Sequence, residues 1–128
     1  MNVVDSSGWL EYFADATNAP FFAPVIEETE SLIVPVVSVY EVFKRVFLQS
    51  GESKALEAVA AMLQAEVIAF DVNLALNAAK LSIDHKLPMV DSIIWATARA
   101  YDATLWTQDR DFAQIEGVKY VEKLVPSQ

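Results

Sequence analysis

Short apolar segments alternate with segments of helical spacing along the whole chain, and this alternation limits the possible folds more than any other feature. The apolar segments cover residues 2–4, 32–37, 66–70, 103–107 and 118–122. They carry few polar residues, as strands do when both faces of a sheet are covered. Strands that alternate with helices pair in parallel through crossovers, which place helices on both faces of the sheet. The sequence therefore predicts an α/β fold of three layers, α/β/α, around a short, mainly parallel sheet.

The segments between the strands predict helices over residues 6–15, part of 18–30, 38–51, 52–64, 71–86, 90–102 and 110–116. Ser38 is interpreted as the N-cap of the third helix, Gly51 as its end, and Pro88 as the stop after the fifth. The helix over 90–102 is apolar on nearly every side, which indicates burial. A chain of 128 residues with three glycines and five prolines, and no repeat or linker, is expected to form one domain over residues 1–128.

Composition excludes several classes of site and partner. The chain has no cysteine and a single histidine, which rules out disulfides, thiolate zinc sites and thiol nucleophiles. Nine basic residues against 18 acidic ones give a net charge of −9, so nucleic acid cannot be held by bulk electrostatics and would need a local site. No apolar run reaches the ~20 residues of a membrane-spanning helix. Because the N-terminus also lacks a signal-like segment, we expect a cytoplasmic protein without a membrane partner.

Acidic residues follow the predicted strands, at the sheet edge where ligands bind in α/β folds. Asp5 comes directly after the first strand, and Glu41 lies one helical turn beyond the second. Asp109 and Asp111 follow the fourth strand. Asp91 begins the buried helix that leads into the fourth strand, and sequence alone does not place it at either edge. The pattern thus brings at least four carboxylates toward one edge.

Each acid also has a structural explanation. Asp5, Asp71, Asp91 and Asp109 could each cap the helix that follows, and Ser38 with Glu41 forms an S-x-x-E capping box. The combination, however, is costly, because converging carboxylates repel each other and lose solvation unless a cation lies among them. Oxygen donors without nitrogen or sulfur suit Mg²⁺ or Mn²⁺, and such ions can promote hydrolysis of a phosphodiester. Asp71 alone we interpret as an ordinary cap.

Four motifs, in this order, resemble a known family. The segments "VVDSS", "SVYEVFKR", "VDSIIWATARA" and "LWTQDRDF" are similar to those of the PIN domain, in particular the VapC-type toxins of bacterial toxin–antitoxin pairs. The resemblance covers nearly the whole chain. It implies a Mg²⁺- or Mn²⁺-dependent ribonuclease that cleaves RNA, forms a homodimer and is inhibited by a cognate antitoxin protein. It also implies that the N-terminus of the helix carrying Asp91 approaches the acidic pocket.

The resemblance assigns roles to individual residues. The acidic quartet corresponds to Asp5, Glu41, Asp91 and Asp109, and Asp111 corresponds to the additional acid two residues later. Asp5, Asp91 and Asp109 would be direct or water-mediated metal ligands, with Asp111 as a peripheral one. Glu41 would orient a metal-bound water or share a second ion.

Two hydroxyl residues and four basic residues complete the candidates. Ser6 and Thr107 match the hydroxyl positions beside the first and fourth acids and could hydrogen-bond a carboxylate or a phosphate oxygen. The candidates for contact with RNA are Lys44, Arg45, Arg99 and Arg110.

Three other functions remain open at the level of sequence. A phospho-receiver module would use Asp71 as the phosphorylated residue, but the usual acid pair at the first strand is missing, and no lysine follows "LWT" or closes "VKYVEK" in a convincing way. A non-enzymatic binding module would use every acid as a cap. A structure-specific DNA nuclease would share the fold.

Some notable residues carry no catalytic role in this interpretation. We interpret His85, Trp95 and Trp106 as structural. Trp9 and its aromatic neighbours are attributed to the core, with a partner surface as the alternative.

Overall fold

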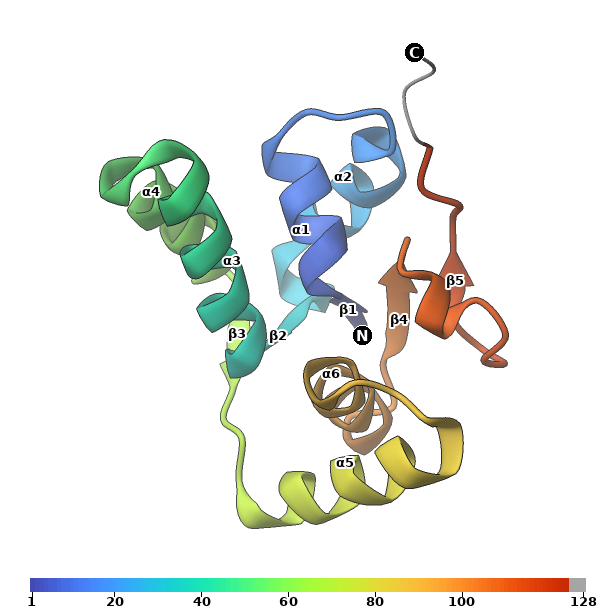
Figure 1. Ribbon diagram of the computed structural model, residues 1–128. Helices are drawn as coiled ribbons and strands as arrows, with labels where there is room; N and C mark the ends of the chain where they lie inside the picture. Colours follow the sequence, from blue (N-terminus) through green and yellow to red (C-terminus); the bar gives the residue numbers. More distant parts are fainter. Residues whose placement is uncertain (125–128) are drawn as a thin grey trace.

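The computed structural model describes residues 1–124 and confirms the predicted α/β fold (Figure 1). The strands are β1 (Asn2–Val4), β2 (Ile33–Pro35), β3 (Glu66–Ile68), β4 (Thr104–Thr107) and β5 (Lys119–Tyr120). The helices are α1 (Ser6–Phe13), α2 (Ala19–Glu27), α3 (Val36–Ser50), α4 (Glu52–Met62), α5 (Val72–His85) and α6 (Met89–Ala100), with 3₁₀ turns at Thr29–Ser31 and Arg110–Phe112. No helix within residues 1–124 is long and apolar enough to span a membrane.

All strand pairs are parallel. β4 lies between β1 and β5, and β2 pairs with β3. A single bridge between Asn2 and Leu32 joins the two parts, so the strand order is β3-β2-β1-β4-β5. Val4 is opposite Trp106 in the β1–β4 register, and this pairing places the next residues, Asp5 and Thr107, side by side. The carboxyl ends of the two central strands therefore meet at one edge.

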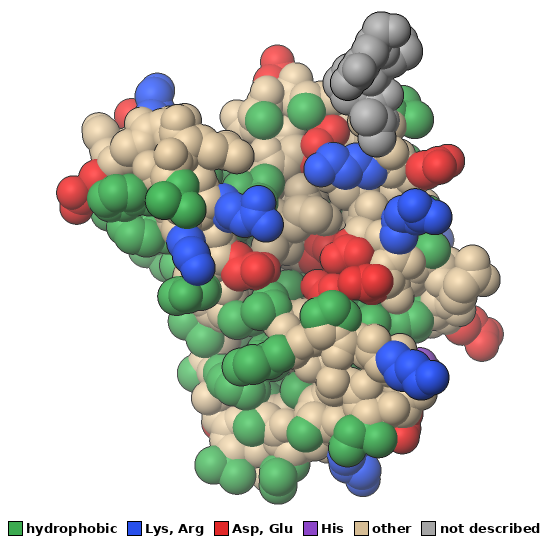
Figure 2. Space-filling view, in the orientation of Figure 1, with side chains coloured by type: hydrophobic (Ala, Val, Ile, Leu, Met, Phe, Trp, Pro, Cys, Tyr) green, Lys and Arg blue, Asp and Glu red, His purple; other side chains and the backbone are tan. Residues whose placement is uncertain are grey.

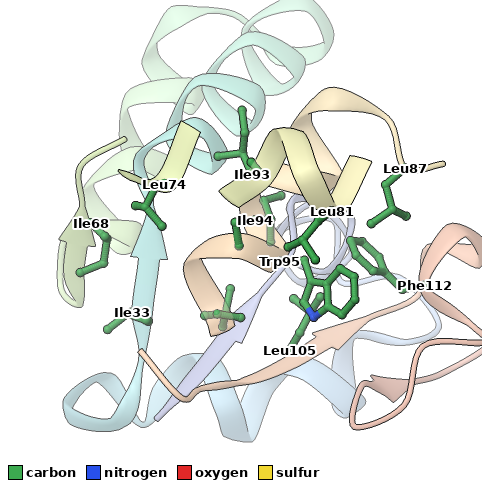
Figure 3. Packing of buried hydrophobic residues seen from close by; sticks show 14 residues of the cluster. Ile33, Ile68, Leu74, Leu81, Leu87, Ile93, Ile94, Trp95, Leu105 and Phe112 are labelled. Carbon is green, nitrogen blue, oxygen red and sulfur yellow. The ribbon is translucent and has the colours of Figure 1, made fainter. Parts of the chain in front are cut away.

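Alternate residues of the short strands face two separate apolar clusters, which makes the three layers. Val3, Ile33 and Leu105 pack against α5 and α6 in one cluster (Figure 3). Val4 and Val34 pack on the other face against residues of α1 to α4. Because neighbouring residues of a strand point to opposite faces, a strand buried on both sides must be apolar at every position. This accounts for the unbroken apolar segments of the sequence.

The aromatic residues of the first helix belong mainly to this packing. Trp9 is 1% exposed within the second cluster, and Tyr12 and Phe13 are half-buried against it. Gly8 lies so close to Phe22 that an added Cβ would stand 2.7 Å from the Phe22 ring. A glycine is therefore needed for α1 to approach α2.

Two capping predictions are wrong. α3 begins at Val36, after Pro35, so Ser38 is its third residue and no capping box with Glu41 forms. Pro35 has extended backbone angles (φ −60°, ψ 135°), and its missing N–H makes it a natural boundary between a strand and a helix. The second strand is correspondingly shorter than the predicted 32–37. Asp91 is likewise the third residue of α6, which follows Pro88, and it caps nothing.

Other helix ends agree with the prediction. The Asp71 side chain accepts a hydrogen bond from the backbone N–H of Leu74 at 2.9 Å and caps α5. Gly51 ends α3 with φ of 89°, a conformation that favours glycine. The last predicted helix is an exception. Instead of a helix over 110–116, only a 3₁₀ turn over Arg110–Phe112 forms.

Candidate active site

A pocket of about 370 Å³ lies where α1, α3 and α6 meet the carboxyl end of β4. Figure 2 shows a group of acidic side chains at the centre of this face, with Lys and Arg side chains on both sides of it. The residues that line the pocket are Asp5, Ser6, Ser7, Leu10, Glu11, Ala14, Glu41, Arg45, Gln49, Asp91, Gln108, Asp109 and Lys123. All four members of the predicted acidic quartet are among them.

Asp5 is the most deeply buried acid of the pocket. It is 1% exposed, and its carboxylate accepts hydrogen bonds from the Thr107 hydroxyl at 2.6 Å, the Gly8 N–H at 2.9 Å and the Ser7 hydroxyl at 2.8 Å. Asp5 therefore caps α1 and lines the pocket at once. Burial raises the pKa of Asp5 to about 6, although the three hydrogen bonds act in the opposite direction.

Thr107 connects the first acid to the fourth. Its hydroxyl donates to Asp5 and accepts the backbone N–H of Asp109 at 2.9 Å. Thr107 itself is fully buried. The β1–β4 register thus fixes the relative positions of Asp5 and Asp109 through one side chain.

Three carboxylates converge beside this pair. Oxygens of Asp91, Asp109 and Asp111 lie within 4.8 Å of one another. Burial, followed by the negative charge of Asp109 and a hydrogen bond with it, raises the pKa of Asp91 to about 8, and Asp5 and Asp111 add to the effect. Asp111 is exposed and stands at the rim, outside the pocket lining. The sequence could not place Asp91, and the structure brings it to the predicted acids.

The remaining predicted residues occupy the walls. Glu41 is half-buried on α3, and it is not one of the three converging carboxylates. Ser6 is buried, and its hydroxyl has no hydrogen-bond partner within residues 1–124. Ser7, which sequence reasoning missed, is the serine that bonds to Asp5.

A buried amide network at the pocket edge was also missed. Gln108, which is 3% exposed, donates to the Ser7 carbonyl at 3.3 Å and to Glu11 at 3.2 Å. The Asn18 side-chain amide donates to Gln108 at 2.9 Å and to the carbonyl of Glu122 at 3.0 Å. The only sign of this network in the sequence is the position of Gln108 between Thr107 and Asp109. No sequence pattern indicates that Asn18 is the partner of Gln108.

Of the four basic residues predicted to contact RNA, only Arg45 lines the pocket. Lys44 lies over the Tyr40 ring, 5.8 Å from its centroid, and Arg99 lies 5.4 Å from the centroid of Trp95. Lys123 lines the pocket and was not among the predictions.

The donor chemistry of the pocket fits a hard divalent cation. Its lining within residues 1–124 offers carboxylates, hydroxyls and amides as ligands, beside the cations Arg45 and Lys123, and contains no histidine or cysteine. Mg²⁺ and Mn²⁺ prefer such oxygen ligands. Burial is the main cause of the raised pKa values of Asp5 and Asp91, and neighbouring carboxylates add to both shifts. A cation in the pocket would favour the charged form of each group.

Fold and pocket together define a class: a three-layer α/β domain with an acidic, oxygen-lined site at the carboxyl edge of a parallel sheet. The family model of the PIN domain matches residues 3–118. The chain therefore belongs to the PIN-domain family. This membership leaves no support for the phospho-receiver hypothesis, whose acceptor Asp71 lies outside the pocket lining.

Several solved structures share the fold. VapC20 from Mycobacterium tuberculosis, a sarcin-ricin loop cleaving toxin, superposes with a TM-score of 0.79 at 17% identity, over 93% of this chain and 98% of that one. A toxin–antitoxin complex from Klebsiella pneumoniae gives 0.76 at 22% identity, over 92% and 95% of the two chains. DNA-bound VapBC from Salmonella typhimurium gives 0.72 at 14% identity, over 95% and 98%. No curated protein matches the chain.

Proposed function

We propose that the protein is a Mg²⁺- or Mn²⁺-dependent endoribonuclease, the VapC-type toxin of a toxin–antitoxin pair, which hydrolyses RNA phosphodiester bonds. The observation that carries the proposal is the convergence of Asp91, Asp109 and Asp111 within 4.8 Å, beside Asp5, in an oxygen-lined pocket. Membership of the PIN-domain family supports a nuclease. The similarity of fold to VapC20 and to toxin–antitoxin complexes supports a toxin.

In this proposal Asp5, Asp91 and Asp109 are the principal metal ligands, and Asp111 is a peripheral one. A bound divalent ion would supply Lewis acidity toward the phosphodiester and lower the pKa of a coordinated water. Thr107 holds Asp5 in place by its hydrogen bond of 2.6 Å. Because its pKa is raised to about 8, Asp91 carries a proton at neutral pH in the absence of a cation and must release it to become a ligand.

Two further residues face the substrate in this proposal. Glu41, on the α3 wall, would accept a hydrogen bond from the attacking water and orient it. The buried hydroxyl of Ser6, which lacks a partner within residues 1–124, would donate to a phosphate oxygen.

The test is a cleavage assay on purified protein. A panel of RNAs, and DNAs of the same sequences, is incubated with Mg²⁺, with Mn²⁺ or with EDTA. We expect metal-dependent cutting of RNA that Asp91→Asn and Asp109→Asn abolish. Asp84→Asn is the matched control, because Asp84 is an exposed acid on α5 outside the pocket lining.

Other outcomes of the cleavage assay would contradict the proposal or favour another function. Cutting that survives Asp91→Asn and Asp109→Asn would come from a contaminant and would remove the proposal. Cutting of DNA alone would favour a DNA nuclease. No cutting and no metal binding would favour a non-enzymatic binding module.

The proposed partners are an antitoxin protein and a second copy of the chain. Exposed apolar side chains occur at Val36 and Tyr40 on α3, at Val72 and Leu76 on α5 and at Met89 on α6. Figure 2 shows many hydrophobic side chains on the lower part of this face, and an extended apolar surface typically marks a protein interface. We expect light scattering to give twice the mass of the chain. Addition of a co-encoded antitoxin in equal amount should stop cleavage.

A further inference from the structure

The pocket has two basic residues that the proposed metal chemistry does not use. Arg45 projects from α3, and Lys123 follows β5 near the end of the described chain; both line the same pocket as the catalytic acids. α1 lies between α3 and the segment after β5 (Figure 1). The two cations therefore reach the pocket from different elements of the fold, and Figure 2 shows Lys and Arg side chains around the acidic group on this face.

An RNA strand needs such cations here. Six carboxylates line the pocket or stand at its rim, namely Asp5, Glu11, Glu41, Asp91, Asp109 and Asp111. Two divalent ions would bring only four positive charges, so the pocket would still repel a polyanion. Local positive charges at the pocket wall would offset that repulsion where the phosphates pass.

Both cations are free to bind a phosphate. Within residues 1–124 the single ion pair closer than 4.0 Å joins Lys54 and Glu57, far along the chain from either residue. Arg45 and Lys123 are exposed, so their charged ends reach solvent. Among the described residues, no carboxylate forms an ion pair with either of them.

Lys123 is held at the pocket by the buried amide network. β5 ends at Tyr120, and two hydrogen bonds secure the following segment: Val121 N–H to the Thr107 carbonyl at 3.0 Å, and the Asn18 amide to the Glu122 carbonyl at 3.0 Å. Asn18 is 7% exposed and also donates to Gln108. A buried polar network that is satisfied in one arrangement specifies that arrangement.

We propose that Arg45 and Lys123 bind RNA phosphates at the wall of the acidic pocket, and that the buried amide pair of Asn18 and Gln108 positions Lys123 to do so. The inference rests on the proposed ribonuclease function. Arg45 and Lys123 act on substrate binding, and Asn18 acts through Lys123 and touches no substrate.

The first experiment measures steady-state RNA cleavage at several salt concentrations. Arg45→Gln and Lys123→Gln should each raise KM about tenfold, the usual value of one charge-assisted contact, with kcat changed less than twofold. The slope of log kcat/KM against log salt should fall by about 0.7 for each lost contact with a single strand. Lys119→Gln is the matched control, because Lys119 is an exposed lysine on β5 outside the pocket lining.

The second experiment tests positioning. Asn18→Leu should raise KM in the wild-type background and have no further effect in the Lys123→Gln background. Asn18→Ser replaces it if circular dichroism shows that the leucine variant does not fold. Additive effects of the Asn18 and Lys123 variants would contradict the positioning role.

The third experiment does not depend on turnover. In the Asp109→Asn protein, saturating RNA should protect Lys123 from acetylation, while Lys119 in the same sample stays reactive by mass spectrometry. Equal reactivity of the two lysines, or equal KM changes in Lys123→Gln and Lys119→Gln, would overturn the inference and leave the ribonuclease proposal standing. Absence of any cleavage by the wild-type protein would instead contradict the ribonuclease proposal.

Discussion

Replacement of Asp5 by asparagine tests how strongly the pocket destabilises its own carboxylates. Burial raises the pKa of Asp5 from 3.8 to about 6 in the folded protein. A difference of about 2 pH units corresponds to about 3 kcal/mol, at ~1.36 kcal/mol per unit. The pKa of Asp5 is higher in the folded state than in the unfolded state. The protonated group therefore makes its full contribution to the free energy of unfolding below the unfolded-state pKa, and this contribution is lost as pH rises through about 6.

The asparagine has no proton to lose, so Asp5→Asn escapes this loss. In EDTA, the free energy of unfolding of Asp5→Asn minus that of the wild type should therefore rise by about 3 kcal/mol between about pH 3.5 and about pH 7.5. Urea denaturation followed by tryptophan fluorescence at each pH gives both values, and Asp84→Asn controls for the loss of one negative charge. A difference that stays the same across this range would refute the reasoning, because ionisation of the buried Asp5 would then not destabilise the folded protein.

Three further predictions follow from the same geometry. At pH 8, Mg²⁺ or Mn²⁺ at about 100 times its dissociation constant should stabilise the protein by about 2.7 kcal/mol. Differential scanning fluorimetry should show a smaller gain in stability at pH 5.5, where Asp91 is protonated. The Asp91→Asn variant should show no gain at either pH, and a gain in that variant would contradict the prediction. Gly8→Ala should cost about 1–3 kcal/mol in urea denaturation, because the new Cβ would stand 2.7 Å from the Phe22 ring; an unchanged midpoint would mean that α1 can shift away. Thr107→Val should raise the pKa of Asp5 further, since the hydrogen bond from Thr107 lowers it, whereas Thr107→Ser should not; NMR titration of the Asp5 carboxyl distinguishes them.

The acids of the two central strands could be found from the sequence by a single rule. Parallel strands end at the same edge, so Asp5 and Asp109 were expected to approach each other. What the rule cannot supply is the register of β1 against β4. The hydrogen bond from Thr107 to Asp5 depends on that register, and no local pattern encodes it.

Asp91 shows a different limit. It lies on a helix that covers the face opposite α1, and only the approach of its third residue to the sheet edge brings it to the pocket. Helix position depends on packing over the whole sheet, so the residues alone left it unplaced. The family resemblance implied that the N-terminus of this helix approaches the acidic pocket, and a carboxylate oxygen of Asp91 lies within 4.8 Å of one of Asp109.

Short-range rules were least reliable where two of them competed. The S-x-x-E pattern of Ser38 and Glu41 favoured a capping box. The helix begins earlier, however, directly after Pro35, which lies three residues before Ser38. The partnership of Asn18 with Gln108 could not be predicted at all, because it joins residues 90 positions apart with no repeating pattern between them.

The pairing of β1 with β4 bears on how the protein is made. β1 leaves the ribosome well before its partner on one side, β4, which begins at Thr104. Any product released by a premature stop codon before Thr107 lacks the residue that joins Asp5 to Asp109. During translation the pocket can close only after β4 has been synthesised, and chains that end before β4 are expected to be inert.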